Sequence, residues 1–213
     1  QPKVFVAENV TGLVKGTAKG YFKRILAELR DCGYKVSCKI IDSQWLGVPQ
    51  KRQRTIFVGV RNDLNKEPSH PAPLPFRYSV EEAIAGCKSP GENERRSLSL
   101  NSKTAKYWRS TIPGRNFADA CKEDSGKGSF FNMTKLDPAT PAPTITATCQ
   151  QFHWSEFRYL TIPELKRVST FPDDFDLTGE FLQQWERCGR AVPPVMMKHI
   201  AKNIEEAILK CVA

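Results

Sequence analysis

Two short stretches of the sequence place charged side chains directly beside apolar runs. Glu8 and Asn9 follow one run, so a strand would present a carboxylate and an amide at its carboxyl end, where open α/β sheets bind ligands. Arg52 and Arg54 precede a second run, Thr55–Val60. A carboxyl group held near a substrate can transfer a proton, and an arginine can hold an oxygen atom through planar donors of fixed charge. Together the stretches predict acid–base chemistry with electrostatic support.

Each stretch taken alone has a less specific interpretation. A Glu-Asn pair after a strand is usually a turn whose carboxylate is satisfied locally. The run Gln50–Arg54, taken by itself, is most often a solvated basic loop. The functional interpretation therefore depends on both stretches occurring together, each beside a predicted strand.

The composition is that of a basic protein of one-domain size. The chain has 213 residues and a mass of 24.0 kDa, with a formal net charge of +9 and an isoelectric point near 9.3. Hydrophobic residues make up 40%, which is enough for a packed core. The positive balance favours a polyanionic partner, nucleic acid first. The alternative is an ordinary protein that happens to be basic.

Cysteine and histidine usage argues against a metal centre and a disulfide framework. The seven cysteines include no Cys-x-x-Cys pair, and the three histidines form no cluster with them. We therefore expect no metal and a reducing, cytoplasmic environment. No apolar run of about 18 residues occurs, so no membrane partner is expected. The start at Gln1, inside a predicted strand, suggests a piece of a longer protein.

Hydrophobic periodicity predicts strands and one helix in the first part of the chain. Lys3–Val10 is expected to be a buried strand because its centre is continuously apolar. Residues 21–32 fit an amphipathic helix, and residues 34–40 and 55–60 fit strands. This order predicts an α/β fold, the second half of a doubly wound Rossmann-like sheet.

The stretch from residue 61 to residue 157 has weak periodicity and many prolines. A short helix is expected at 79–86. Between residues 103 and 135, seven basic residues and three acidic ones are interleaved with aromatic side chains. This mixture suits a nucleic-acid surface. It suits equally well a small irregular domain whose aromatic side chains form the core.

Regular structure returns at the capping box Thr161–Glu164, which predicts a helix as far as Thr170. A short helical piece follows at 181–185. A long final helix with one apolar stripe is expected after Pro194. The stripe consists of Met197, Ile200, Ala201, Ile204, Ile208 and Cys211.

Three motifs of the chain resemble those of the cytosine-5 DNA methyltransferases. They occur in the family's order and span nearly the whole sequence. The motifs are Glu8-Asn9-Val10, the Gln-x-Arg-x-Arg segment Gln50–Arg54, and the closing segment Gly189–Pro194.

The resemblance implies a catalytic role for residues of the first two motifs. In this chemistry a thiolate adds to C6 of cytosine, and a carboxyl group of raised pKa assists by protonating or hydrogen-bonding N3. Glu8 would supply that carboxyl group, and Asn9 would brace the turn beneath it. Arg54, with Arg52 beside it, would hold the O2 atom of the base. The base must leave the helical stack, so the site would be a pocket for a flipped cytosine.

The resemblance also implies contacts with DNA. Thr144 and Ile145 match a threonine and aliphatic residue that contact DNA near the target base, and Gln50 is expected at the DNA as well. Arg158 matches an arginine that helps to orient the recognition domain. The exposed-strand alternative for Thr144 and Ile145 stays open.

The implied organisation is a target-recognition domain at 65–157 between two catalytic segments, 1–64 and 158–213. In the family the closing motif packs beside the S-adenosylmethionine pocket, so Ala191 and Val192 would contact that cofactor. Arg190 departs from the pattern, because asparagine is usual at this position.

Two features of the family are absent from the sequence. No cysteine follows a proline, and no Phe-x-Gly-x-Gly occurs, so the nucleophile and the main cofactor motif are missing. The chain is therefore expected to be the carboxyl-terminal part of a bacterial or phage methyltransferase, inactive alone. Its partners would be duplex DNA and a complementing amino-terminal half, within a longer chain or as a subunit of a split enzyme. The alternative is a DNA-binding remnant without catalysis.

Overall fold

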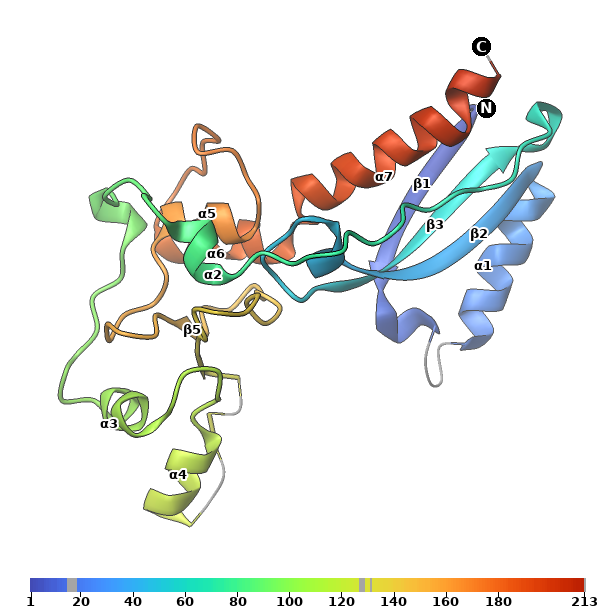
Figure 1. Ribbon diagram of the computed structural model, residues 1–213. Coiled ribbons are helices and arrows are strands. Elements are labelled where there is room, and N and C mark those ends of the chain that lie inside the picture. The colour runs from blue at the N-terminus through green and yellow to red at the C-terminus, as the bar shows by residue number, and fades with distance from the viewer. Residues whose placement is uncertain (15–18, 127–128, 131, 213) are drawn as a thin grey trace.

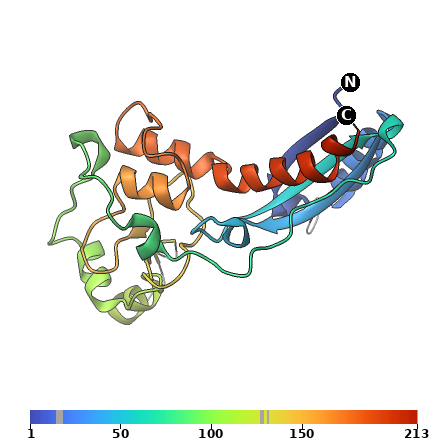
Figure 2. The same cartoon turned by 45° about the horizontal axis from the view of Figure 1, so that its top comes forward.

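The computed structural model describes residues 1–14, 19–126, 129–130 and 132–212 (Figure 1). The chain forms two lobes that meet at a narrower middle (Figure 2). Residues 1–75 and 194–212 make up the sheet lobe, and residues 76–190 make up the second lobe. Each lobe has its own hydrophobic core.

Among the described residues, the sheet lobe contains one three-stranded sheet in which both strand pairs are antiparallel. Its elements are β1 (Val4–Val10), η1 (Thr11–Val14), α1 (Lys19–Asp31), β2 (Tyr34–Asp42), η3 (Ser43–Leu46), β3 (Gln53–Arg61), η4 (Asn62–Leu64), α7 (Pro194–Ala207) and η6 (Leu209–Cys211). The strand order is β1-β3-β2, and β3 runs antiparallel to both neighbours. β1 and β2 therefore run in the same direction, with α1 between them in sequence. The predicted α/β class is confirmed, although the strand inserted between β1 and β2 is reversed relative to an all-parallel sheet.

Helices cover the two faces of this sheet (Figures 1 and 2). α7 packs Met196, Ile200 and Ile204 against Ile56 and other aliphatic residues of one face. On the other face Phe22 of α1 and Phe57 of β3 have ring centroids 5.8 Å apart.

The predicted stripe on the final helix is confirmed at Ile200, Ile204 and Ile208, which are buried, and Met197 packs partly buried against the same core. The prediction is wrong at two positions and omits one. Met196 is fully buried, whereas Ala201 and Cys211 are exposed. The buried residues follow at intervals of four through α7 to its C-cap, so they lie on the one face that packs against the sheet.

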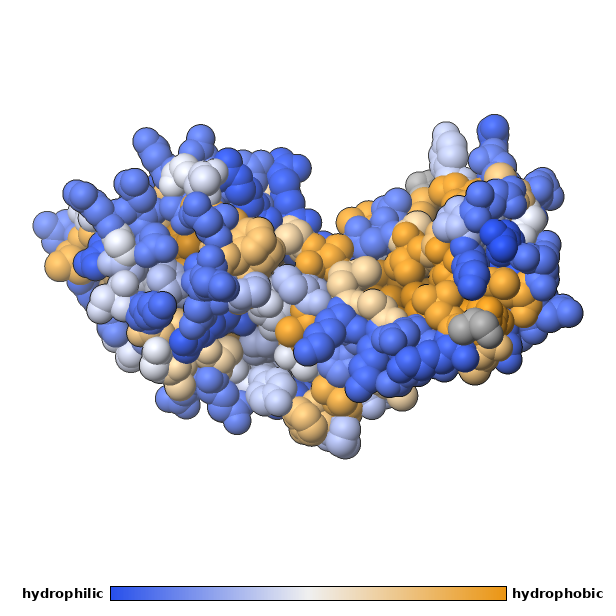
Figure 3. All heavy atoms as spheres, turned by 90° about the horizontal axis from the view of Figure 1, so that it is seen from above, coloured by the Kyte–Doolittle hydropathy of each residue, from blue (hydrophilic) through white to orange (hydrophobic). Residues whose placement is uncertain are grey.

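The prediction that β1 is a buried strand is also wrong. Residues from Val6 to Val10 are exposed, with Val6 at 37% and Val10 at 56%. Within the part of the chain that the structure describes, β1 is an edge strand that pairs only with β3. An apolar run looks the same in sequence whether its strand is central or at an edge. Figure 3 shows the resulting broad apolar area on the sheet lobe.

A proline-rich segment at 65–75 runs back along the sheet lobe as an extended strap (Figure 1). His70 Nε2 lies 3.2 Å from Ser37 Oγ on β2. The backbone N–H of Leu74 donates to the carbonyl of Trp45 at 2.8 Å. The strap therefore packs on the sheet lobe, although the predicted domain division places it with the recognition segment.

The second lobe is mostly irregular chain around short elements. They are α2 (Val80–Ile84), η5 (Glu92–Glu94), α3 (Lys103–Ser110), α4 (Ala118–Ser125), β4 (Thr134–Lys135), β5 (Gln151–Phe152), α5 (Ile162–Val168) and α6 (Phe181–Arg190). Its core contains Phe117, Phe152 and Trp185, all fully buried. α5 and α6 pack in this core, so the packing groups them with residues 80–157 rather than with the sheet.

Two predicted helix starts are found, and their ends differ from the prediction. Thr161 caps α5 through a capping box with Glu164. α5 stops at Val168, before Thr170, which has a left-handed φ of 60°. α6 continues through Arg190, so the start of the closing motif is helical rather than part of a turn.

No helix in the described ranges is long and apolar enough to cross a membrane. Within the same ranges, His, Cys, Asp and Glu side chains form no group of three or more that could hold a metal ion.

Candidate active site

Glu8 and Arg54 form an ion pair at the carboxyl end of β1. The antiparallel register places Arg54 opposite Val10, two residues beyond Glu8 and on the same face of the sheet. Arg54 Nε lies 2.7 Å from Glu8 Oε1, and the side chains are 15% and 31% exposed. The sheet thus brings together two residues from separate motifs and leaves the carboxylate open to a ligand.

Asn9 points to the opposite face from Glu8, because successive side chains of a strand alternate. Its Oδ1 accepts a hydrogen bond from the backbone N–H of Val10 at 2.8 Å. This local bond fixes the backbone at the end of β1, where Glu8 must be held.

Arg52 occupies a different environment from Arg54. It is 2% exposed, and its guanidinium donates to the carbonyls of Ile145 at 2.8 Å and Gly189 at 3.0 Å. Burial, with a contribution from the charge of Arg54, lowers the pKa of Arg52 to about 10. These bonds tie the sheet lobe to two distant segments of the second lobe, so Arg52 positions the site rather than facing a substrate.

The two lobes meet at a junction formed by residues 49–52 of the sheet lobe and by residues 142–146 and Gly189 of the second lobe. Backbone hydrogen bonds reinforce this junction. The N–H of Lys51 donates to the carbonyl of Ala142 at 2.8 Å, and the N–H of Ala142 donates to the carbonyl of Pro49 at 2.9 Å. Thr144 Oγ1 donates to the carbonyl of Lys51 at 2.6 Å. The segment before β3 and the segment at 142–145 therefore form one continuous unit beside Glu8 and Arg54.

Gly189 fits this junction because it lacks a side chain. A Cβ atom at position 189 would overlap the carbonyl group of Thr146. Trp185 Nε1 donates to the same carbonyl at 3.2 Å. α6 thus approaches the 142–148 segment closely enough to fix its path.

The side chains of two residues that were predicted to contact DNA are buried, so they cannot make that contact. Ile145 is fully buried in the core of the second lobe, and Gln50 is 1% exposed. Gln50 Oε1 accepts a hydrogen bond from the N–H of Ile145 at 3.2 Å, so both side chains are used inside the junction. Thr144 is half-buried, and the exposed residues of the 142–148 segment are Pro143, Thr146 and Thr148. The sequence Thr144-Ile145-Thr146 already indicates that Ile145 faces away from the two threonines, because neighbouring side chains of an extended chain point in opposite directions.

A family model described as C-5 cytosine-specific DNA methylase matches residues 1–206. The chain belongs to this family. A type II methyltransferase of Neisseria gonorrhoeae, M.NgoFVII, is 31% identical over 220 residues, covering 96% of this chain and 59% of that protein. The type II methyltransferase M.BbvI of Brevibacillus brevis is 32% identical over 234 residues, covering 100% of this chain and 59% of that protein. The chain thus spans less than two thirds of the length of these methyltransferases.

Solved structures share the fold of this family member. A prophage-encoded E. coli protein described as a DNA modification methyltransferase superposes with a TM-score of 0.70 at 20% identity, over 97% of this chain and 70% of that chain. The Entamoeba histolytica methyltransferase EhMeth gives a TM-score of 0.62 at 13% identity, over 97% of this chain and 63% of that chain.

The side chain of Arg158 makes its ion pairs within the second lobe of this methylase chain. Its guanidinium donates to both carboxylate oxygens of Glu164, at 2.7 and 2.9 Å, and to Glu156 at 2.9 Å. Because Glu164 also caps α5 at Thr161, the arginine links the segment before α5 to the helix start. This arrangement orients backbone rather than offering a free charge to DNA.

Residues 190–192, where contact with the family's cofactor S-adenosylmethionine is predicted, have few groups that are free to bind a ligand. The N–H of Ala191 donates to the carbonyl of Arg187 at 3.2 Å, and Val192 packs against the core of the sheet lobe. Arg190 points to solvent and pairs with Glu186 at 2.7 Å. At these three positions, therefore, the backbone and side chains are already engaged within the protein.

The environments of four cysteines oppose a nucleophilic role. Burial raises the pKa of the thiols of Cys38, Cys87, Cys149 and Cys188. A nucleophilic cysteine needs the opposite, a lowered pKa that yields a thiolate.

Proposed function

We propose that this chain is the carboxyl-terminal portion of a DNA (cytosine-5-)-methyltransferase that acts on a flipped cytosine in duplex DNA. The observation that carries the proposal is the ion pair of Glu8 and Arg54 at the carboxyl end of β1. A carboxyl group and a guanidinium at this spacing suit the N3 and O2 atoms on one edge of a cytosine ring.

The chemistry assigned to this chain is proton handling at the base. When a thiolate from outside the chain adds to C6, electron density moves into the ring. Glu8 delivers a proton to N3, and Arg54 stabilises the charge that develops at O2. C5 becomes nucleophilic as a result. S-adenosylmethionine supplies the methyl group in this family, and its main site is assigned to protein outside this chain.

The second lobe and the junction are proposed to bind DNA around the target. The chain's net charge of +9 favours phosphate contacts, which release counterions and make binding salt-dependent. Thr146, rather than Ile145, is the proposed side-chain contact of its segment because it is exposed. The type II relatives support a role in restriction-modification in a bacterial or phage cytoplasm.

The open edge of β1 supports the view that this portion works with a complementing half. An unpaired edge strand with exposed apolar side chains offers a place for further strands. That half would belong to the same longer chain or to a separate subunit. The second candidate function is a DNA-binding remnant, which the second lobe's own core and the net positive charge of the whole chain favour.

A complementation assay tests these alternatives. The chain is mixed with an amino-terminal half from a type II relative, and methyl transfer to duplex DNA is measured. We expect activity only in the mixture, and a loss of about 100-fold or more for Glu8→Gln, in line with removal of a general acid.

The matched control is Glu28→Gln. Glu28 also pairs with an arginine at 2.7 Å, but on the solvent side of α1, so this variant should keep full activity. An inert mixture combined with salt-sensitive DNA binding by the chain alone would favour the remnant. Equal activity of Glu8→Gln and Glu28→Gln would refute the catalytic assignment.

A further inference from the structure

A hollow between the strap and the second lobe gathers exposed aromatic side chains around one arginine. Its volume is about 510 Å³, and its lining includes Trp45, Phe76, Arg77 and Glu82. Trp45 is 38% exposed and Phe76 is 48% exposed. Tyr78, also exposed, packs edge-on against Phe76 with ring centroids 5.4 Å apart. Large apolar side chains that are exposed together, rather than singly, mark a binding surface.

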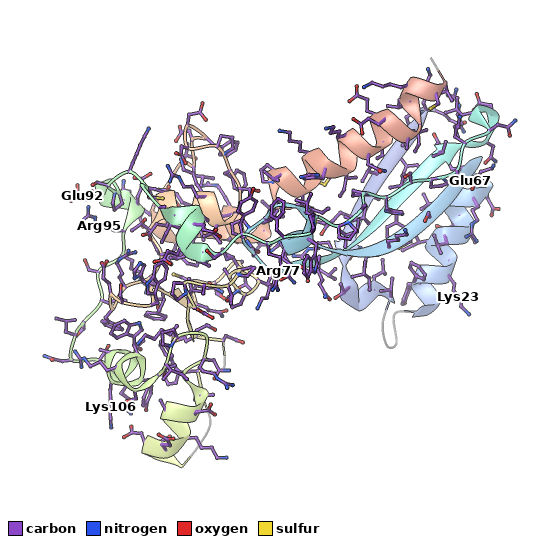
Figure 4. All side chains as sticks on the ribbon, in the orientation of Figure 1. Lys23, Glu67, Arg77, Glu92, Arg95 and Lys106 are labelled. Atoms are coloured by element: carbon purple, nitrogen blue, oxygen red, sulfur yellow. The ribbon has the colours of Figure 1, made fainter. Side chains whose placement is uncertain are left out.

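Arg77 gives this hollow a positive charge. Its guanidinium carbon lies 4.9 Å from the ring centroid of Trp45, and Nη1 donates to Gln44 Oε1 at 3.2 Å. Figure 4 places Arg77 where the strap leaves the sheet lobe, at the middle of the molecule. The arginine is therefore held in a fixed plane beside an exposed ring.

A series of hydrogen bonds leads from this hollow to the candidate active site. Gln44 Nε2 donates to Asp42 Oδ2 at 2.8 Å, and Gln53 Nε2 reaches the same oxygen at 3.5 Å. The carbonyl of Gln53 accepts from Arg54 at 2.7 Å, and Arg54 pairs with Glu8. Only β3 separates β1 from β2, so the two strands lie about 10 Å apart. These contacts link the hollow to the ion pair of Glu8 and Arg54.

We propose that this hollow is a second nucleotide subsite, which takes an unpaired nucleobase of the bound DNA. The proposal rests on the proposed function, because flipping a cytosine leaves its former partner unpaired near the site. The rings of Trp45 and Phe76 offer a stacking surface, and Arg77 offers a charge for the adjoining phosphate. Glu82 Oε2 accepts from Ser79 at the start of α2, and the other carboxylate oxygen of Glu82 can accept from an exocyclic amino group. The volume lies within the range of about 300–1,000 Å³ typical of small-ligand sites.

The test compares two DNA duplexes that differ only in one unpaired 2-aminopurine nucleotide. Binding of the whole chain is measured by anisotropy, and stacking by quenching of 2-aminopurine fluorescence. We expect the chain to bind the duplex with the unpaired base at least about five-fold more tightly, as one base–aromatic stack implies. Trp45→Ala should abolish this preference and the quenching, while Trp45→Phe should keep most of both.

Two controls separate this subsite from general DNA binding. Phe175→Ala removes another exposed aromatic, 45% exposed in the second lobe, and should leave the preference intact. Thermal melting of Trp45→Ala and Trp45→Phe checks that both variants are folded. An equal preference in Trp45→Ala and in the unmodified chain overturns the subsite while leaving duplex binding in place. Failure to bind either duplex would instead count against the proposed function itself.

Discussion

The two lobes build their hydrophobic cores from different kinds of side chain. The sheet lobe's core consists of aliphatic side chains and Met196 between β3 and α7. The second lobe's core includes six buried aromatic residues among short elements. Aliphatic side chains interlock on the repeating surfaces of a sheet and a helix, whereas large rings fill irregular spaces. The second lobe therefore completes its core with little regular structure, and the sheet lobe has regular structure but an open edge.

The lobes are joined by buried polar contacts rather than by a shared apolar core. The side chains of Arg52 and Gln50 supply three of these contacts, and backbone bonds of Lys51 and Ala142 add others. Glu8 and Arg54 lie beside this junction, so the position of the second lobe and the geometry of the candidate site are determined by the same residues.

The largest effect is expected for Arg52→Ala. This change leaves the buried carbonyls of Ile145 and Gly189 without their donor, and we expect a loss of about 3 kcal/mol in the free energy of unfolding. Urea denaturation followed by tryptophan fluorescence measures it. Arg54→Ala is the matched control and should cost less than about 1 kcal/mol, because its ion pair is partly exposed. Similar losses in both variants would mean that Arg52 does not join the lobes.

Gly189→Ala should come next, with a loss of about 1–3 kcal/mol. The added methyl group would overlap the backbone carbonyl of Thr146, and backbone cannot move aside as a side chain can. The control is Gly126→Ala, where open space surrounds the position although its φ of 71° adds backbone strain. Thermal melting compares the stability of the two variants. Activity in the complementation assay should also fall with Gly189→Ala, because α6 can no longer pack closely against the 142–148 segment.

A smaller loss, about 1 kcal/mol, is expected for Thr161→Ala at the start of α5. The capping box is lost, although Glu164 keeps its bonds to Arg158. Ser79→Ala removes an equivalent capping box from α2. Chemical denaturation should rank Thr161→Ala as the more costly change because Thr161 is 8% exposed and its helix packs in the core. The opposite ranking would show that α2 contributes more to this lobe than α5.

Sequence patterns predicted the elements whose residues interact locally. The capping box at Thr161 follows from a short local motif at a helix start. The placement of Glu8 and Arg54 at one site came from the family resemblance, because the two residues lie on different strands. The burial of Gln50 and Ile145 did not follow, because their hydrogen bond joins residues 95 positions apart. The exposure of β1 was missed for a related reason. An apolar strand is buried only if another element covers it, and periodicity within the strand carries no information about that neighbour.

The smallest effect on stability is expected at the open edge, with Val6→Lys. Val6 is 37% exposed on β1, so the isolated chain should change by no more than about 0.5 kcal/mol. Leu182→Lys changes a side chain of α6 that is 51% exposed in the second lobe and should be equally mild. The two variants should differ in complementation, because only Val6→Lys places a charge where a complementing half would cover β1. Titration of the amino-terminal half against each variant, read as methyl transfer, measures this difference. If Val6→Lys unfolds the chain as a core substitution would, by about 2–5 kcal/mol, then β1 is covered within the chain and no partner strand is needed.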